Sequence, residues 1–414
     1  MLPCVMEAYV SFRKRSTPVI RRQHHQPTKT TPNKRSPVRT VCGEHWGPSP
    51  ERSQSVTINR NDPARSNRRG FTLKELFVVT FIIALFLCLC VLPLGRRGGG
   101  REAARRMQCT NNMKQLVLAL HNYHDTYGRF PTAMGGTGLG GNENRLNALV
   151  PLLPFLESSP FYDQIYSGSY GAPPGGPAPW DTTFPPWQQH IEVFVCPSAY
   201  YEGKDYQGTN YAFCVGDVTR DIHQLSKPRG AFAPGLYVKL SDITDGTSYT
   251  IAMAEIGTAY GRQVQGQYAT NLPATILDDP GICWRTVDSG KKYYSGKVGL
   301  HEFGRGYNWV DGGAGPGLFN TILPPNSPSC AVGGLEAVDG VYSAGGHHPG
   351  GCIVAFTDGS VQFVSEEVDV GDTAQAPPTI ENYATDALAS PYGVWGAFGT
   401  INGGEEVDRD DLWK

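Results

Sequence analysis

The chain has 414 residues, a formal net charge of −2 and 40% hydrophobic residues, a composition that excludes a wholly disordered protein. Its 50 glycines and 32 prolines favour many turns and short strands over long helices. The charge is unevenly distributed, because residues 1–69 hold fourteen Lys and Arg against four acidic residues, and the remainder is acidic.

Residues 1–70 are predicted to be a basic disordered leader, since they are rich in Arg, Pro, Ser, Thr and Asn and lack apolar periodicity. A basic arm of this kind could bind nucleic acid. It could equally lie on the cytoplasmic side of a membrane anchor, where Lys and Arg accumulate. The segment that follows favours the anchor, so nucleic acid is not expected as a partner.

An uncharged apolar run of about nineteen residues extends from Leu76 to Leu94, long enough to cross the hydrocarbon core as a helix. A buried core helix is the alternative, but such helices rarely stay apolar on every face. The apolar core of a secretory signal peptide should be shorter than this run and should end at a small-residue cleavage site, which Leu92-Pro93-Leu94-Gly95-Arg96 does not supply. Residues 71–95 are therefore predicted to form a transmembrane helix.

The segment 96–127 is predicted to be an amphipathic helix. After a glycine-rich break, its helical pattern starts near Arg101 and ends before Phe130-Pro131. A further short helix is expected within Leu146 to Tyr166. In the 96–127 helix, six residues recur at the spacing of one helical face: Met113, Leu116, Val117, Leu120, His124 and Tyr127.

Residues 128–368 are predicted to form a β-rich domain, with the remaining residues 369–414 as an acidic C-terminal tail in which Tyr392 to Phe398 could still pack. The strongest strand signal is a hairpin closed by Asp358-Gly359, because both residues tolerate the positive φ of a tight turn. The β-type runs are Ile191–Val195, Tyr211–Val215, Tyr249–Ala254, Gly351–Thr357 and Val361–Val364.

The sequence Gly70-Phe71-Thr72-Leu73-Lys74-Glu75 ahead of the apolar run resembles the prepilin cleavage site of type IV pilins and type II secretion pseudopilins. The resemblance implies that a membrane prepilin peptidase cuts between Gly70 and Phe71 and methylates the new amino terminus of Phe71. It also implies an assembly role for Glu75, which would pair with the free amine of a neighbouring subunit. A carboxylate at the edge of an apolar span is costly unless it is paired, although an interfacial acid that reaches water is the alternative.

Several later blocks of the sequence occur together in a fixed order: Arg101 to Gln115, Leu152 to Glu157, Cys196-Pro197-Ser198, Thr209-Asn210-Tyr211 and Asp245 to Ser248 with Glu255. They are followed by a histidine, nine residues and Asp-Gly, which are His348, Asp358 and Gly359. These blocks are similar to the DUF1559 family of pilin-like proteins, which is typical of planctomycete bacteria and has this histidine and Asp-Gly as its signature. The resemblance covers about residues 69–366.

A metal or catalytic role for His348 and Asp358 competes with a structural one, and the structural role is preferred because the two residues bracket the predicted hairpin. His347 and His348 lack the three or four converging ligands that a metal site needs. His121, His124 and Asp125 are expected on a polar helix surface. Asp242, Asp245 and Glu255 lack the spacing of a calcium loop. No metal site, cofactor or catalytic residue is predicted.

Six cysteines lie beyond the apolar run, an even number that permits three disulfides in an oxidising compartment or buried thiols instead. Sequence cannot choose among their pairings. The six are Cys109, Cys196, Cys214, Cys283, Cys330 and Cys352.

The sequence therefore predicts an α+β protein, with a pilin-like transmembrane helix followed by a large extracytoplasmic domain rich in antiparallel β-sheet. We expect a non-enzymatic structural or assembly protein in the inner membrane, with a cytoplasmic N-terminus and a periplasmic or cell-surface domain. Membrane lipid, the prepilin peptidase and other pilin-like subunits are the expected partners. The alternative is an anchored solute- or glycan-binding module, since aromatic rings can stack on sugars or pack in a core. The residues behind that alternative are Trp180, Trp187, Trp284 and Trp309.

Overall fold

The computed structural model describes residues 70–91, 97–199, 207–384 and 387–413. Nearly all of the predicted basic leader and the end of the apolar run lie outside the described residues. The chain divides into residues 1–72 and residues 73–414, and the fold below concerns the second unit.

The first helix, α1 (Leu73–Val91), takes up most of the apolar run and carries Glu75 in its first turn. Large apolar side chains cover it on every side and are 44–70% exposed between Leu76 and Leu87. Among the described residues, no helix combines the length and the apolarity that a membrane crossing requires.

The second helix, α2 (Arg97–Tyr127), is longer than expected, because the glycines before Arg101 are already helical. Four of its predicted face residues are buried in the core, namely Met113, Leu116, Val117 and Leu120. Gly128 ends the helix at a positive φ of 70°, and its N–H donates to the carbonyl of His124 (2.7 Å). This is a left-handed helix cap, which glycine adopts at the least cost.

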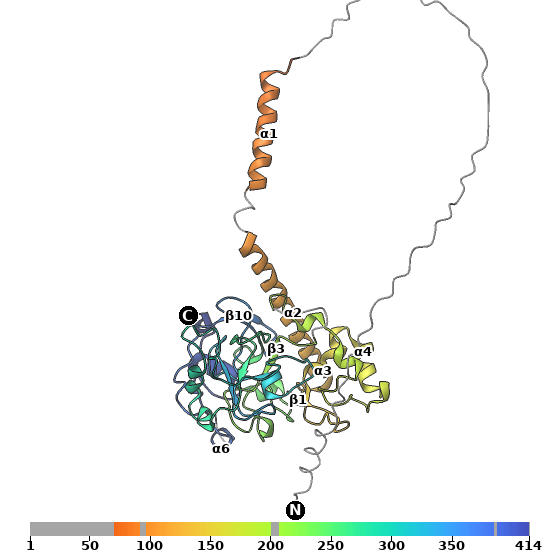
Figure 1. The fold of residues 1–414 in the computed structure, drawn as a ribbon, viewed down its shortest axis with the longest axis vertical. Helices are drawn as coiled ribbons and strands as arrows, with labels where there is room; N and C mark the ends of the chain where they lie inside the picture. Colours follow the sequence, from red (N-terminus) through yellow and green to blue (C-terminus); the bar gives the residue numbers. More distant parts are fainter. Residues whose placement is uncertain (1–69, 92–96, 200–206, 385–386, 414) are drawn as a thin grey trace, which may run out of the picture. The chain divides into compact units, whose positions relative to one another are not determined.

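The segment from Leu146 to Tyr166 forms several short elements instead of one helix. Prolines at 151, 154 and 160 lack the N–H that a continuous helix needs, and Glu157 takes a positive φ of 58°. Figure 1 shows α3 (Leu149–Leu152) beside the C-terminal part of α2. The elements in this region are β1 (Met134–Gly135), β2 (Leu146–Asn147), α3 (Leu149–Leu152), η3 (Leu153–Leu156), α4 (Ser159–Tyr166) and η4 (Ser169–Gly171).

A five-stranded sheet forms the centre of the domain, in the order β10-β9-β4-β3-β6. Its strands pair antiparallel except for β3 and β6, which are parallel. The predicted hairpin is confirmed, since Val361 pairs with Ala355 and Asp358-Gly359 lie in the turn between the strands. The strands are β3 (Tyr211–Cys214), β4 (Ile251–Glu255), β6 (Leu318–Phe319), β9 (Gly351–Phe356) and β10 (Val361–Ser365).

The central sheet is buried on both faces, which explains why its strands read as nearly continuous apolar runs instead of alternating ones. One face, with Phe213, Met253 and Ile353, belongs to the core that includes Met113 and Leu116 of α2. Alternate residues of the same strands point to the other face. That face packs with the C-terminal residues Trp395, Phe398 and Leu412.

The residues predicted as a C-terminal tail thus cover one face of the sheet, mainly through α7 (Gly393–Gly399). Asp245 holds the chain beyond α7 in place by accepting N–H groups from Gly403 (2.6 Å) and Gly404 (2.9 Å). Asp245 thus fixes the segment beyond α7 instead of contributing to a calcium site. The other two elements of this region are α6 (Ile380–Tyr383) and η11 (Arg409–Trp413).

A smaller three-stranded sheet, in the order β5-β7-β8, lies over a separate apolar cluster. Its strands are β5 (Tyr268–Ala269), β7 (Ser329–Ala331) and β8 (Gly340–Val341). The remaining short helices lie in the connections between strands: η5 (Pro185–Gln188), η6 (Glu192–Phe194), η7 (Ile222–Gln224), η8 (Leu240–Asp242), η9 (Ala274–Leu277), η10 (Pro280–Thr286) and α5 (Ala314–Gly317).

The strand predicted at Ile191–Val195 is wrong, because this segment forms the 3-10 helix η6. The Val195 N–H donates to the carbonyl of Glu192 within the turn (3.1 Å), the Asn210 N–H donates to the carbonyl of Phe194 (2.9 Å), and the Asn112 side-chain amide of α2 donates to the carbonyl of Val195 (3.0 Å). Taken together, the mixture of helices and mainly antiparallel sheet confirms the α+β class.

Candidate functional site

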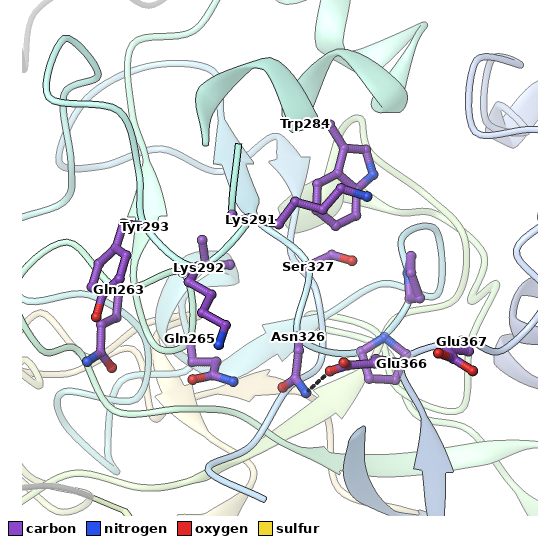
Figure 2. A pocket seen from close by; sticks show the side chains of 14 residues that line it. Gln263, Gln265, Trp284, Lys291, Lys292, Tyr293, Asn326, Ser327, Glu366 and Glu367 are labelled. Atoms are coloured by element: carbon purple, nitrogen blue, oxygen red, sulfur yellow. Dashed lines mark hydrogen bonds between the residues drawn. The ribbon is translucent and has the colours of Figure 1, made fainter. Parts of the chain in front are cut away.

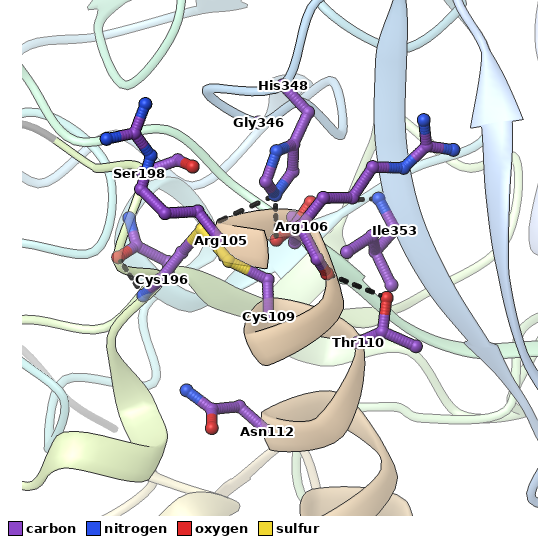
Figure 3. Close-up of polar contacts among 12 residues, drawn as sticks. Arg105, Arg106, Cys109, Thr110, Asn112, Cys196, Ser198, Gly346, His348 and Ile353 are labelled. Atoms are coloured by element: carbon purple, nitrogen blue, oxygen red, sulfur yellow. Dashed lines mark hydrogen bonds and ion pairs between the residues drawn. A yellow bond between two sulfur atoms is a disulfide. The ribbon is translucent and has the colours of Figure 1, made fainter. Parts of the chain in front are cut away.

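A buried histidine lies between two carboxylates at the junction of α2, β4 and the loop before β9 (Figure 3). His348 Nδ1 lies 2.9 Å from Glu102 Oε1, near the start of α2. His348 Nε2 lies 3.5 Å from the Oε1 atom of Glu255, the last residue of β4. The side chains of His348 and Glu255 are each 1% exposed, whereas that of Glu102 is 29% exposed.

The backbone around the cluster fixes these side chains. Glu255 Oε2 accepts the N–H of Ile353 (2.9 Å), which belongs to the neighbouring strand β9. Gly346 leaves room for the carboxylate, because a Cβ atom at this position would lie 2.9 Å from Glu255 Oε2. A side chain at this position, two residues before His348, would therefore displace the Glu255 carboxylate.

The charges of the cluster reinforce one another. Burial lowers the pKa of His348, but the hydrogen bonds and negative charges of Glu255 and Glu102 outweigh it, so that the pKa lies above its ordinary value. Burial raises the pKa of Glu102, yet Arg105 and His348 outweigh this effect and hold it below its ordinary value. The geometry and these shifts together favour a protonated His348 between two carboxylates.

The neighbouring His347 points elsewhere, so the two histidines do not form a pair of ligands. Its Nε2 accepts the N–H of Thr258 (2.9 Å). Burial and the charge of His348 lower the pKa of His347 to about 4, which keeps its ring neutral.

A disulfide between Cys109 of α2 and Cys196 adjoins the histidine, with Cys196 Sγ 3.5 Å from His348 Nε2. Figure 3 shows the bond crossing from α2 to the segment that follows η6. A second disulfide joins Cys283 and Cys330.

The other two cysteines of the predicted set, Cys214 on β3 and Cys352 on β9, are buried thiols. Burial raises the pKa of the Cys214 thiol to about 12 and that of Cys352 well above its ordinary value. Neither thiol is therefore suited to nucleophilic chemistry.

The His348 and Asp358 of the sequence signature have different surroundings. Asp358 lies in the hairpin turn, where its Oδ1 accepts the N–H of Ser360 (2.8 Å) and its Oδ2 lies 3.7 Å from Arg409. Gly359 takes the positive φ of 90° that the turn requires. Only His348 belongs to the buried cluster.

The remaining acidic and histidine groups considered in the sequence are not brought together. His124 Nε2 accepts the N–H of Leu240 (3.4 Å), and Asp242 caps the short helix η8 by accepting the N–H of Lys239 (2.9 Å). Within the described ranges, the potential metal ligands that converge are Cys109, Cys196, Glu255 and His348, whose ligand atoms all lie within 4.8 Å of one another. In the disulfide form the two sulfur atoms offer no thiolate, so no cofactor is assigned to the cluster in this state.

A groove of about 570 Å³ presents amide, ammonium and carboxylate groups (Figure 2). Asn326 Nδ2 donates to Glu366 Oε2 (2.9 Å) on its wall, and Lys291 Nζ lies 4.6 Å from the ring centroid of Trp284. Figure 2 shows the amine of Lys292 pointing toward the same space as Gln265 and Asn326. The groove can thus bind a polar solute through hydrogen bonds and charge.

The four tryptophans considered for sugar stacking divide into two groups. Trp187 and Trp309 are fully buried and pack edge to face with each other in the core. Trp180 is 52% exposed, and Trp284 lines the groove, where Lys291 covers part of its ring. Core packing therefore accounts for the first two.

The residues of the predicted processing site lie at the start of α1. Gly70 and Phe71 precede the first helical residue, and the side chain of Phe71 is 82% exposed. Apart from its chain neighbours, no atom of the described residues lies within 4 Å of the position that a Cβ of Gly70 would take. Glu75 lies in the first turn of the helix.

Sequence reasoning missed Glu102 and the partnership of Cys109 with Cys196. One signal was available for the first, because Glu102 lies seven residues before Cys109 and therefore on the same face of a helix. No spacing indicated that Glu255 and His348 would join them.

Residues 99–371 match the model of a family described as "Protein of unknown function (DUF1559)". Neither a search of curated proteins nor one of solved structures gave a match.

Proposed function

The chain belongs to the DUF1559 family, and from this premise we propose that it is a pilin-like structural or assembly protein processed between Gly70 and Phe71. In this proposal a prepilin peptidase removes the basic leader and methylates Phe71. The mature chain is held at the inner membrane through its first helix, with its domain in the periplasm or at the cell surface.

The observation that carries the proposal is the exposure of apolar side chains along α1. Ten large apolar residues between Leu76 and Leu87 are 44–70% exposed, among them Phe77, Phe81 and Phe86. Each such side chain gains about 1.5–3 kcal/mol when it is removed from water. A helix of this kind therefore needs an apolar environment, which membrane lipid and the helices of neighbouring pilin-like subunits would supply.

The geometry around Gly70 supports proteolytic processing. Residues 70–72 precede the helix, and Gly70 is exposed with open space around its Cα. Peptidases act on extended and accessible backbone, and glycine presents the least steric obstruction.

The two disulfides support a domain outside the cytoplasm, because disulfides persist in oxidising compartments and are rare in the cytosol. The packing of α2 against the antiparallel strands β9 and β10 is in keeping with a pilin-like arrangement of helix on sheet.

The proposal is tested by mass spectrometry of the N-terminal peptide of the full chain from membrane fractions, with and without the peptidase. We expect a methylated Phe71 terminus only when the peptidase is present. Gly70→Val should abolish this cleavage, whereas Gly100→Ala, at a second glycine with no atom near its Cβ position, should leave it unchanged. A mature terminus at any other residue would refute the processing step.

The groove favours a second function, the binding of a solute or glycan by the anchored domain. Its volume of about 570 Å³ falls in the range of small-molecule sites, and Lys292, Asn326 and Glu366 offer groups for orienting a ligand. A glycan array probed with the full chain in detergent tests it. Specific binding that is lost in Lys292→Ala would support it, and the absence of binding across the array would retire it.

A further inference from the structure

The cluster around His348 combines the side chains that zinc prefers. Two cysteine sulfurs, one imidazole nitrogen and one carboxylate oxygen, from Cys109, Cys196, His348 and Glu255, lie within 4.8 Å of one another. Zinc sites in proteins are usually tetrahedral, with four ligands drawn from cysteine sulfur, histidine nitrogen and carboxylate oxygen. This set comes from four separate parts of the chain, so no sequence spacing announces it.

The imidazole is oriented as in a metal site. Its Nδ1 atom is held by Glu102 Oε1 at 2.9 Å, which leaves Nε2 directed at Cys196 Sγ (3.5 Å) and at Glu255. Histidine ligands of metals almost always present their other ring nitrogen to a carboxylate, a carbonyl or water, which fixes the tautomer and the ring. Glu102 is placed to do this.

The carboxylate of Glu255 has one oxygen engaged and one available. Its Oε2 atom accepts the N–H of Ile353, whereas its buried Oε1 atom has, within the described ranges, only the long contact with the His348 ring. The nearest charged group to Oε1 is His348 Nε2 at 3.5 Å. A buried carboxylate oxygen is costly unless it is closely partnered, and a metal ion would bind it more closely than this 3.5 Å contact does.

We propose that reduction of the Cys109–Cys196 disulfide converts this cluster into a Zn²⁺ site with Cys109, Cys196, His348 and Glu255 as ligands. A dithiol supplies two electrons and two protons, becomes a disulfide itself and leaves two thiols on the chain. Zn²⁺ then displaces the two thiol protons and the proton of His348 Nε2. The Cα atoms of the two cysteines are already 5.2 Å apart, so side-chain rotation alone can open the sulfurs to the distance of about 3.7 Å that tetrahedral Zn–S bonds require.

The site would link α2, the segment after η6, β4 and the loop before β9 in the reduced state, as the disulfide links two of them in the oxidised state. The domain would thereby keep its attachment to α2 when the disulfide is lost. This inference does not depend on the pilin-like function proposed above.

Cobalt serves as the probe, because tetrahedral Co²⁺ bound to thiolates has strong charge-transfer and visible d–d absorption. The full chain in detergent is titrated with Co²⁺ before and after reduction with a phosphine, which is not itself a thiol ligand. We expect one Co²⁺ per chain with two thiolate ligands in the reduced protein only, and displacement of this Co²⁺ by Zn²⁺. Equal binding by the oxidised protein, or no thiolate bands after reduction, would overturn the proposal.

Variants assign the ligands. Cys109→Ser with Cys196→Ser should abolish the bands, and Cys283→Ser with Cys330→Ser, which removes the other disulfide, should leave them unchanged. Glu102→Gln should weaken binding about 10–100-fold without changing the number of thiolates, as expected for a residue that orients a ligand. Bands that persist without Cys109 and Cys196, or vanish without Cys283 and Cys330, would assign the metal elsewhere. The comparison of oxidised with reduced wild-type protein decides the matter even if a variant fails to fold.

Discussion

Glu102 Oε1 lies 2.9 Å from His348 Nδ1, although 246 residues separate them, and so the start of α2 is tied to the loop that precedes β9. Arg105 reinforces the same carboxylate from one turn further along the helix, at 2.8 Å. The partial exposure of Glu102 limits the strength of this link, since water and salt screen its charge.

We expect Glu102→Gln to lower the free energy of unfolding of the oxidised protein by about 1 kcal/mol, because a charge-assisted hydrogen bond becomes a neutral one. Arg105→Gln is the control. Its side chain is 47% exposed, so its loss should cost less than the loss of the Glu102 charge. Thermal unfolding of the full chain in detergent measures both, and an equal or larger effect of Arg105→Gln would contradict the importance of the His348 contact.

The two disulfides should stabilise the domain to similar extents, and the Cys109–Cys196 bond should contribute slightly more to the free energy of unfolding. Its cysteines are 87 residues apart, whereas those of the Cys283–Cys330 bond are 47 apart. Loop-closure entropy then predicts losses of about 4–5 kcal/mol at most, with about 0.5 kcal/mol between the two. Double Cys→Ser variants of each pair, compared by denaturant unfolding without metal, test this order. A negligible loss for either pair would show that it contributes no constraint.

A buried ion pair between Asp217 and Arg229 should matter more than any exposed one. The Arg229 guanidinium makes two contacts with the carboxylate, at 2.7 and 3.1 Å, and the side chains are 0% and 2% exposed. Asp217→Asn leaves a buried arginine without its counter-charge, and we expect it to lower the free energy of unfolding by about 3–5 kcal/mol.

The exposed pair of Arg220 and Asp278, at 2.6 Å, provides the matched control. Asp278→Asn should lower the free energy of unfolding by about 0–1 kcal/mol, because both members of this pair are exposed to water. Similar losses in unfolding free energy for the two substitutions would contradict the role of burial.

Local signals in the sequence predicted the local parts of the fold. The hairpin followed from Asp358-Gly359 between two β-type runs, and α2 followed from apolar residues at helical spacing. Both features depend on neighbouring residues, whose physical preferences act over a few positions. The start of α2 was missed because glycine is a poor helix former, and its position here is decided by context.

Tertiary contacts decided the features that the sequence could not indicate. Ile191–Val195 has the residue types of a strand, yet it forms a 3-10 helix. Phe194 is fully buried in the core, and carbonyls of the segment accept from Asn112 of α2 and from the backbone of Asn210. The His348 cluster joins residues from four regions of the chain. The sequence around His348 resembles a turn, and only the folded structure places this histidine at the centre of a buried, charged cluster.

His223 should make the domain less stable in mild acid. Burial and the charge of Arg145 lower its pKa to about 4, and its Nε2 accepts the N–H of Ala314 (3.1 Å). An unfolded histidine has a pKa near 6.5, so the unfolded state takes up a proton that the folded state excludes. Stability is therefore complete above about pH 6.5 and falls as the pH drops toward 4, by about 3 kcal/mol at most.

The measurement is the unfolding free energy of wild type and His223→Gln between about pH 7 and 4. The glutamine oxygen can accept the same N–H group but does not take up a proton. The slope of stability against pH should therefore be smaller in the variant, and identical slopes would show that His223 does not remain neutral in the folded protein.

Glu75 should affect assembly and leave processing intact. It lies in the first turn of α1, where the helix dipole favours a negative charge, and four residues after the proposed amino terminus at Phe71. In the proposed assembly its carboxylate pairs with the amine of a neighbouring subunit in apolar surroundings, where loss of one partner costs about 3–5 kcal/mol. Glu75→Gln should thus still be cleaved, as seen by mass spectrometry, while cross-linking between two differently tagged copies of the chain falls by at least about tenfold.

Lys74→Gln, a charge change at the adjacent position, is the control and should preserve cross-linking. If both variants assemble like wild type, Glu75 is an interfacial acid with no part in subunit pairing.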